Sequence, residues 1–263
     1  MNSALRALST VVGLLFAMVA TPSFAVENSG DEGASAPIMW GLAVSVNASP
    51  YAADDDDILV FPLPVRFTDP AFTDGLFVFR EGSLGLRWVV EDHWHVGVLG
   101  RLQYLGFKST DSPTFTGMAE RSGTVELGPF IGYRSDTLQY LFLTYFDALD
   151  EHGGMEARLS IQQPYNLGDR YFVVHADVVY QNADMLDYYF GVLPGEATVP
   201  RPAYAPGSAM STAIGGRAGW KLTDRLALFP EAEVQFMASE IKDSPIVDSS
   251  TRWGAFVMLA YDF

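Results

Sequence analysis

Apolar and polar residues alternate with a period of two in segments of about ten residues along much of the chain. The last segment is the most regular: Trp253, Val257 and Leu259 fall on one face, and Arg252 and Asp262 fall on the other. Successive side chains of a β-strand point to opposite faces, so this period indicates strands. Twelve strands are predicted, at 39–47, 58–67, 76–81, 83–90, 94–106, 123–134, 138–148, 154–164, 171–181, 210–222, 226–237 and 252–263.

The predicted connections alternate in length. Long connections follow odd-numbered strands, as at 107–122 and 182–209, and short ones follow even-numbered strands, as at 135–137. Two places fit less well, because 68–75 is long for a turn and the connection near Gly82 is tight for a loop. This pattern is typical of a closed antiparallel transmembrane β-barrel with short periplasmic turns and longer external loops. We expect an all-β barrel of about 12 strands, within a range of 10–14.

The first 25 residues have the pattern of a cleaved signal peptide. Arg6 precedes an apolar run at 11–20, and Ser23-Phe24-Ala25 places small residues at the expected cleavage site. The apolar run is too short for a membrane-spanning helix, which needs about 20 residues. We therefore expect a signal peptide at 1–25, an N-terminal periplasmic tail at 26–38, and a transmembrane barrel at 39–263, located in the Gram-negative outer membrane.

Composition narrows the set of partners. The chain has no cysteine, which excludes disulfides and thiolate chemistry, and its net charge of −16 argues against a nucleic-acid partner. Aromatic residues make up 13% of the chain, which suits a wall with lipid on one face. The expected surroundings are outer-membrane lipid and lipopolysaccharide, and no cofactor is expected.

Charged residues in the strands are predicted to face inward and to pair across hairpins. A turn centred on Asp224 places Arg217 opposite Glu231, and a turn near 167–168 places Arg158 opposite Asp177. Charges facing lipid at mid-depth would cost roughly 2–4 kcal/mol each for Arg or Lys, so inward pairing is favoured. These pairs have either a structural role or the role of a selectivity lining.

Prolines interrupt the predicted ladders, because proline has no N–H to donate. Pro62 and Pro64 lie two apart and predict weak pairing, or a bulge, along one side of the second strand. Pro129 and Pro230 predict milder local interruptions.

Catalytic residues are not predicted. None of the four histidines has a metal-ligand spacing such as HExxH, so no metal site is expected either. Ser160, His175 and Asp177 could approach a hydrolase-like arrangement, and His152 lies in an acidic segment, but neither forms a recognisable motif. The acidic run at 54–57 is either a solvated loop or a loose site for Ca²⁺ or Mg²⁺.

Several short segments together resemble the MipA/OmpV family of outer-membrane proteins. The most specific are Asp187–Val192 and, later in the chain, Asp243–Val247. The residues that carry the resemblance are Asp147, His152, Gly153, Gly154, Asp187, Tyr188, Tyr189, Phe190, Gly191, Asp243, Ser244 and Pro245, with supporting segments at 128–133, 204–206 and 261–263. The resemblance implies an outer-membrane barrel, and it transfers no catalytic residue.

Three functions follow as alternatives. The name-giving member of the family is described as a scaffold that joins a murein hydrolase to a murein synthase, so the resemblance implies an envelope scaffold with possible partners of those two kinds. A small pore or transporter is the second hypothesis, and a barrel hydrolase is the third. A terminal strand ending at Tyr261 and Phe263 also resembles the signal that the barrel assembly machinery recognises.

Overall fold

The protein forms one antiparallel β-sheet. A computed structural model describes residues 38–52, 57–66, 75–79, 83–91 and 93–263. Twelve strands in these residues belong to a single sheet. They are β1 (Ile38–Asn47), β2 (Asp57–Arg66), β3 (Gly75–Phe79), β4 (Ser83–Glu91), β5 (Trp94–Gln103), β6 (Thr124–Arg134), β7 (Gln139–Asp147), β8 (Met155–Asn166), β9 (Arg170–Gln181), β10 (Ala209–Lys221), β11 (Leu226–Phe236) and β12 (Thr251–Tyr261). The predicted all-β, antiparallel class is confirmed.

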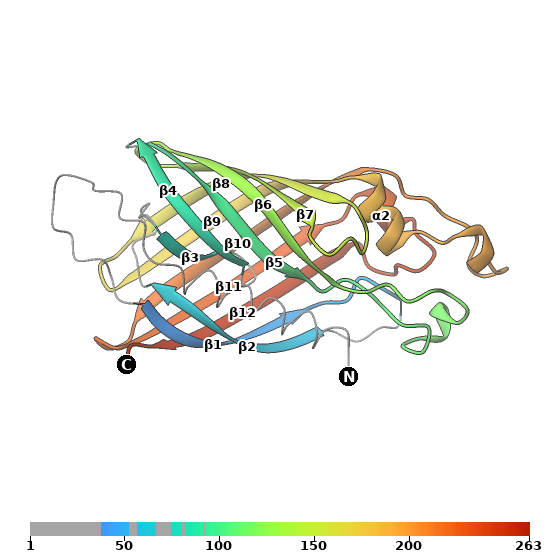
Figure 1. Cartoon of the computed structure of the whole chain (residues 1–263), viewed down its shortest axis with the longest axis horizontal. Coiled ribbons are helices and arrows are strands. Elements are labelled where there is room, and N and C mark those ends of the chain that lie inside the picture. Colours follow the sequence, from blue (N-terminus) through green and yellow to red (C-terminus); the bar gives the residue numbers. More distant parts are fainter. Residues whose placement is uncertain (1–37, 53–56, 67–74, 80–82, 92) are drawn as a thin grey trace.

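The sheet is curled, as Figure 1 shows. Its strand order is β2-β1-β12-β11-β10-β9-β8-β7-β6-β5-β4-β3, so the first strand pairs with the last and the two edges are β2 and β3. Trp40 of β1 lies opposite Tyr261 of β12 in this pairing. The connection expected at 68–75 falls mainly, and the one near Gly82 wholly, outside the described residues.

Burial alternates along most of the strands as the sequence predicts, although β4 is buried at its start and exposed at its end. In β12, Trp253, Val257 and Leu259 are 41–47% exposed, whereas Phe256 and Met258 between them are almost fully buried. The exposed side chains are apolar and lie on the convex face, while the buried ones line the concave interior. The sheet therefore has an apolar outside and a mixed inside.

Proline breaks two of the ladders locally. Between β6 and β7, the register runs from Leu127↔Phe146 directly to Phe130↔Leu143, so Pro129 lies in the gap. A similar gap interrupts the pairing of β10 with β11 near Pro230. The ladders on the other side of both prolines are continuous, which agrees with an effect limited to one neighbouring strand.

The connections differ at the two ends of the sheet. Short turns join β4 to β5, β6 to β7, β8 to β9 and β10 to β11, and the C-terminus lies at the same end (Figure 1). The long connections at the other end contain the helices η2 (Pro113–Phe115), α2 (Ala183–Phe190), η3 (Pro194–Glu196) and α3 (Ser239–Lys242), which the alternation did not predict. No helix in the described residues is long and apolar enough to cross a membrane.

Replacing Gly128 of β6 with alanine is expected to destabilise the sheet. A Cβ at this position would overlap the backbone carbonyl oxygen of Thr144 in β7, which cannot rotate away as a flexible side chain could. Overpacking of this kind typically costs about 1–3 kcal/mol. The midpoint of urea unfolding should therefore fall in Gly128→Ala. Gly195→Ala is the control, because a Cβ there meets nothing within 4 Å. Equal midpoints for the two variants would contradict the close β6–β7 approach.

Candidate functional site inside the curled sheet

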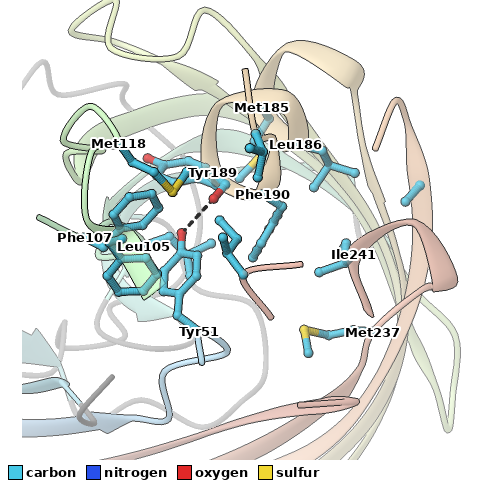
Figure 2. Close-up of a cluster of buried hydrophobic side chains, with 14 residues drawn as sticks. Tyr51, Leu105, Phe107, Met118, Met185, Leu186, Tyr189, Phe190, Met237 and Ile241 are labelled. Atoms are coloured by element: carbon cyan, nitrogen blue, oxygen red, sulfur yellow. Dashed lines mark hydrogen bonds between the residues drawn. The ribbon is translucent and has the colours of Figure 1, made fainter. Parts of the chain in front are cut away.

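A cluster of buried side chains covers the end of the sheet that carries the long connections (Figure 2). We call this cluster the cap. It consists of Tyr51, Leu105, Phe107, Phe115, Met118, Met185, Leu186, Tyr189, Phe190, Val192, Ala209, Met237, Ile241 and Ile246. These residues come from the connections after β1, β5, β9 and β11 and from the adjoining strand end, so four long connections share one core.

Aromatic rings form the centre of the cap. Phe107 and Phe115 stack with ring centroids 4.3 Å apart, and Tyr51 packs edge-on against Phe107 at 5.2 Å. The Tyr51 hydroxyl donates a hydrogen bond of 3.1 Å to the backbone carbonyl of Tyr189 (Figure 2). Burial raises the pKa of the Tyr189 hydroxyl. The cap is therefore a packed, apolar closure.

One face of helix α2 packs in the cap, and the position of the helix is fixed by hydrogen bonds at its first turn. The Asn182 side-chain oxygen accepts hydrogen bonds from the backbone N–H groups of Met185 and Met155, which caps the helix and ties it to β8. Gly154 allows this approach, because a Cβ there would stand 2.6 Å from the Met185 Cβ. The buried residues Met185, Leu186, Tyr189 and Phe190 then lie on the inner face of the helix.

Asp147 organises the turn that carries the family-like histidine and glycines. Its carboxylate accepts hydrogen bonds from the backbone N–H groups of His152 at 2.6 Å and Gly153 at 3.0 Å. Gly153 has a φ of 61°, which favours glycine. The His152 ring points inward and lies 5.3 Å from the Tyr189 ring. These residues therefore hold the turn against the cap.

The two most specific family-like segments meet in space. Ser244 donates a hydrogen bond of 2.7 Å to the backbone carbonyl of Phe190. Asp187 accepts one of 3.1 Å from the Gly207 N–H, and Gly191 donates to the carbonyl of Asp187. Tyr188 packs against the cap from outside. Asp243 is the residue that follows α3, and Pro245 lies between the buried residues Ser244 and Ile246. These connections therefore fold onto the mouth of the sheet.

An ion pair joins two of the connections beside the cap. The Arg121 guanidinium lies 3.0 Å from the Glu196 carboxylate and donates a further bond to the backbone carbonyl of Tyr188. Arg201 adds donations to the backbone carbonyls of Glu196 and Thr114. Burial alone would raise the pKa of Glu196, but hydrogen bonds from two backbone N–H groups and from Arg121 hold it below its usual value. Glu196 is therefore held as a carboxylate.

Buried charges lie beneath the cap, in an arrangement that we call the ion-pair network. Arg101 contacts Glu126 at 2.6 Å and Glu156 at 3.0 Å. Arg158 contacts Asp177 at 3.1 Å and Glu233 at 3.0 Å, and its Nε lies 3.6 Å from Glu156. These side chains are at most 9% exposed. A buried charge is costly unless it is paired, so the pairing explains how the interior can contain them.

The observed hairpin register agrees with the prediction for one of the two predicted charge pairs and differs from it for the other. Arg217 and Glu231 are register partners, and Arg217 also donates a hydrogen bond of 3.0 Å to Gln162. Asp177, however, lies opposite Ser160 rather than opposite Arg158. The expected register is corrected by two residues because the hairpin is centred between Gly168 and Asp169, one residue later than expected. The ion pair between Arg158 and Asp177 forms diagonally.

The same register changes the expected order of the hydrolase-like residues, because Ser160 lies directly opposite Asp177 rather than opposite His175. His175 lies opposite Gln162, and the Ser160 hydroxyl accepts a hydrogen bond of 3.3 Å from the Gln162 amide. His152 is placed elsewhere, with its Nε2 3.4 Å from Glu126. The ring nitrogens of both histidines lie near carboxylate oxygens, because His175 Nδ1 is 3.2 Å from Asp177.

Apolar side chains occupy the part of the interior nearer the short turns. We call this cluster the floor. It consists of Met39, Ala43, Phe61, Leu63, Val65, Leu84, Ala227, Phe229, Phe256, Met258 and Ala260. A smaller group beside it contains Leu99, Phe130, Leu141, Leu143 and Tyr145. Cap, ion-pair network and floor thus occupy successive levels of the interior.

One group of metal-ligating types lies in the network, although no metal-ligand spacing was found in the sequence. His175, Asp177 and Glu233 each offer a ligand atom, and these atoms lie within 4.8 Å of one another. His175 and Asp177 are two apart on one strand face, a spacing that could have been noticed. Glu233 comes from β11, two strands away, and only the fold brings it there. The acidic residues 54–56 lie outside the described residues.

Comparisons with known proteins agree on the family to which the chain is similar. The family model described as MltA-interacting protein MipA matches residues 40–263. Outer membrane protein OmpV of Vibrio cholerae is 34% identical over 151 residues, and Outer membrane protein Omp26La of Vibrio anguillarum is 32% identical over 151 residues. Each match covers 56% of this chain and 57% of the relative, so the chain spans little more than half the length of these relatives.

Two solved structures match most of the length of the chain with low sequence identity. The NanC porin has a TM-score of 0.42 and 10% identity over 85% of this chain and 100% of that one. A bacterial polysaccharide outer membrane secretin has a TM-score of 0.45 and 8% identity over 86% of this chain and 98% of that one.

Replacing Glu196 with glutamine is expected to loosen the cap. Charged hydrogen bonds of this kind contribute about 1.5–3 kcal/mol, so protection of the α2 amides from hydrogen exchange at pH 7 should fall about tenfold or more. The pKa of Glu196 is lowered in the folded protein, so its contribution is complete above its unfolded pKa of about 4.3. The contribution is lost as the pH falls through the folded value.

Hydrogen-exchange mass spectrometry at several pH values measures this effect. Acid should therefore weaken protection of α2 in the wild type and have less effect in Glu196→Gln. The control is Glu151→Gln, which changes an exposed carboxylate in another connection. Unchanged protection in Glu196→Gln at pH 7 would show that the ion pair does not hold the cap.

Proposed function

The chain belongs to the MipA family of outer-membrane β-barrel proteins, and from this premise we propose that it is a scaffold of the cell envelope with a filled interior. In this proposal, residues 1–25 direct export and are removed, and 26–38 form a periplasmic tail. The sheet closes between β2 and β3, so that twelve strands span the outer membrane. Because β2 and β3 are the two edges of a sheet that is already curled, closure between them would leave no free edge.

The distribution of side chains supports a barrel surrounded by lipid and lipopolysaccharide. Leu42, Phe142 and Ile161 on the convex face are 47–59% exposed, as lipid-facing residues would be. The short turns would then face the periplasm and the cap would face outward. The terminal strand ends at Tyr261, and Phe263 beyond it is 91% exposed, as recognition by the barrel assembly machinery would require.

The filled interior is the observation that carries the proposal. A pore needs a continuous water-filled path, whereas the cap, the ion-pair network and the floor occupy the interior with buried side chains. A scaffold needs a rigid membrane anchor, and it does not need a water-filled path through its interior. The same contents argue against the alternative of a small pore, which would require the cap to move. The hydrolase alternative is not favoured, because the ring nitrogens of His175 and His152 lie 3.2 Å and 3.4 Å from carboxylate oxygens.

A murein hydrolase is the proposed partner, because the name of the family's model describes interaction with MltA. We propose that it binds at the short-turn end, together with a murein synthase. A stable interface buries about 800 Å² on each partner, which several turns and the periplasmic tail would have to supply together. Leu167 and Leu222 lie in two of these turns and are 62% and 50% exposed, so they offer apolar contacts.

Paired substitutions at the two ends test the proposal. Leu167→Asp with Leu222→Asp should reduce recovery of a purified periplasmic murein hydrolase of the MltA type on the immobilised barrel at least severalfold. The matched control is Leu193→Asp with Val199→Asp, which changes two exposed apolar residues, 56% and 102% exposed, in a long connection. The control should bind like the wild type. No binding by the wild type, or equal loss in both variants, would contradict a scaffold acting through the short turns.

A further inference from the structure

Three side chains from two strands converge in the ion-pair network. His175 Nδ1 lies 3.2 Å from Asp177 Oδ2 and 3.8 Å from Glu233 Oε2. All three side chains are at most 5% exposed. In a tetrahedral zinc site with bonds of about 2.0–2.2 Å, the ligand atoms lie roughly 3.3–3.6 Å apart. The spacing of these three atoms is therefore close to that of a preformed metal site.

Strand β10 makes this convergence possible. It lies between β9, which carries His175 and Asp177, and β11, which carries Glu233. Its interior-facing residues at this level are Ala213, the register partner of Asp177, and Gly215, the register partner of His175. A Cβ on Gly215 would stand 2.7 Å from His175 Nε2. The small residues of β10 thus leave the space in which side chains two strands apart can meet.

The charge around the three residues favours a cation. In the ion pairs within this part of the described interior, the carboxylates of Glu126, Glu156, Asp177 and Glu233 face the two guanidinium groups of Arg101 and Arg158. Two other arginines lie farther away. Arg217 is the register partner of Glu231, and the positive charge of Arg252 stabilises the carboxylate of Glu156 over a longer distance. Four buried carboxylates in so small a volume make it strongly acidic, which favours the binding of a divalent ion.

We propose that His175, Asp177 and Glu233 form a binding site for a divalent transition-metal ion of the Zn²⁺ class. One imidazole nitrogen and two carboxylate oxygens suit Zn²⁺ or Co²⁺, whereas Mg²⁺ prefers a shell of oxygen atoms alone. A catalytic zinc site commonly uses three protein ligands and one water. The site is independent of the scaffold proposal, because it depends only on the interior of the barrel.

Arg158 competes with the ion for the same carboxylates. Its Nη1 lies 3.1 Å from Asp177 Oδ2 and 3.0 Å from both Glu233 oxygens. A carboxylate has about four lone-pair positions. The oxygens of Asp177 and Glu233 can therefore bind a metal ion in place of the Arg158 guanidinium, or bind both at once. Removing the guanidinium should leave the ligands in place and increase their affinity for a cation.

Metal titration of the purified full-length barrel in detergent tests the site. After stripping with a chelator, the wild type should bind one Zn²⁺ ion by calorimetry, even with Mg²⁺ in excess. Co²⁺ should give the visible absorption of a four- or five-coordinate site and should be displaced by Zn²⁺. Absence of both signals from a correctly folded wild type would overturn the proposal.

Variants locate the ion. His175→Gln and, separately, Asp177→Asn should weaken Zn²⁺ binding at least tenfold, whereas Arg158→Gln should strengthen it. His95→Gln is the matched control, because His95 is another buried histidine, on β5. Heat-modifiable migration in gels checks that each variant is folded. Binding that persists in His175→Gln, is lost in His95→Gln, or is no tighter in Arg158→Gln would contradict the site.

Discussion

The structure depends on the placement of charge in a curled sheet whose outer face is apolar. Every charged residue in the middle of a strand must then point inward, and an inward charge must be paired because little water reaches it. Arg101 and Arg158 meet this need by bridging carboxylates from several strands. The pairing links β5, β6, β8, β9 and β11 across the interior, so the same contacts that neutralise the charges also brace the wall.

The rest of the interior follows from that constraint. Long arginine side chains need space, which small residues such as Ala213 and Gly215 of β10 provide. The cap then covers the network at one end, and the floor covers it at the other. Asp147, Gly154 and Asn182 serve this arrangement indirectly, because they fix the turn and the helix from which Tyr189 and Phe190 reach the cap. The family-like residues are therefore largely explained by closure of one end of the barrel.

Sequence alone predicted the parts that repeat locally. The period of two located the strands, as in β12, and the turn at Asp224 gave the register of Arg217 with Glu231. The register of β8 with β9 was missed by two residues, because moving the centre of a tight turn by one residue moves every cross-strand partner by two. Helix α2 was not predicted, since its eight residues are too few for a clear helical period and are held by the Asn182 cap and by packing. The convergence of Glu233 with His175 could not be predicted, because it depends on the small residues of the strand between them.

Single-channel recording can distinguish a filled interior from an open one. Purified protein inserted into a planar bilayer, with insertion verified by protease protection, should give no stable conductance at moderate voltage. Discrete and reproducible conductance steps from the wild-type protein would mean that water and ions pass the cap, the network and the floor. That result would contradict the account and would favour a transport function.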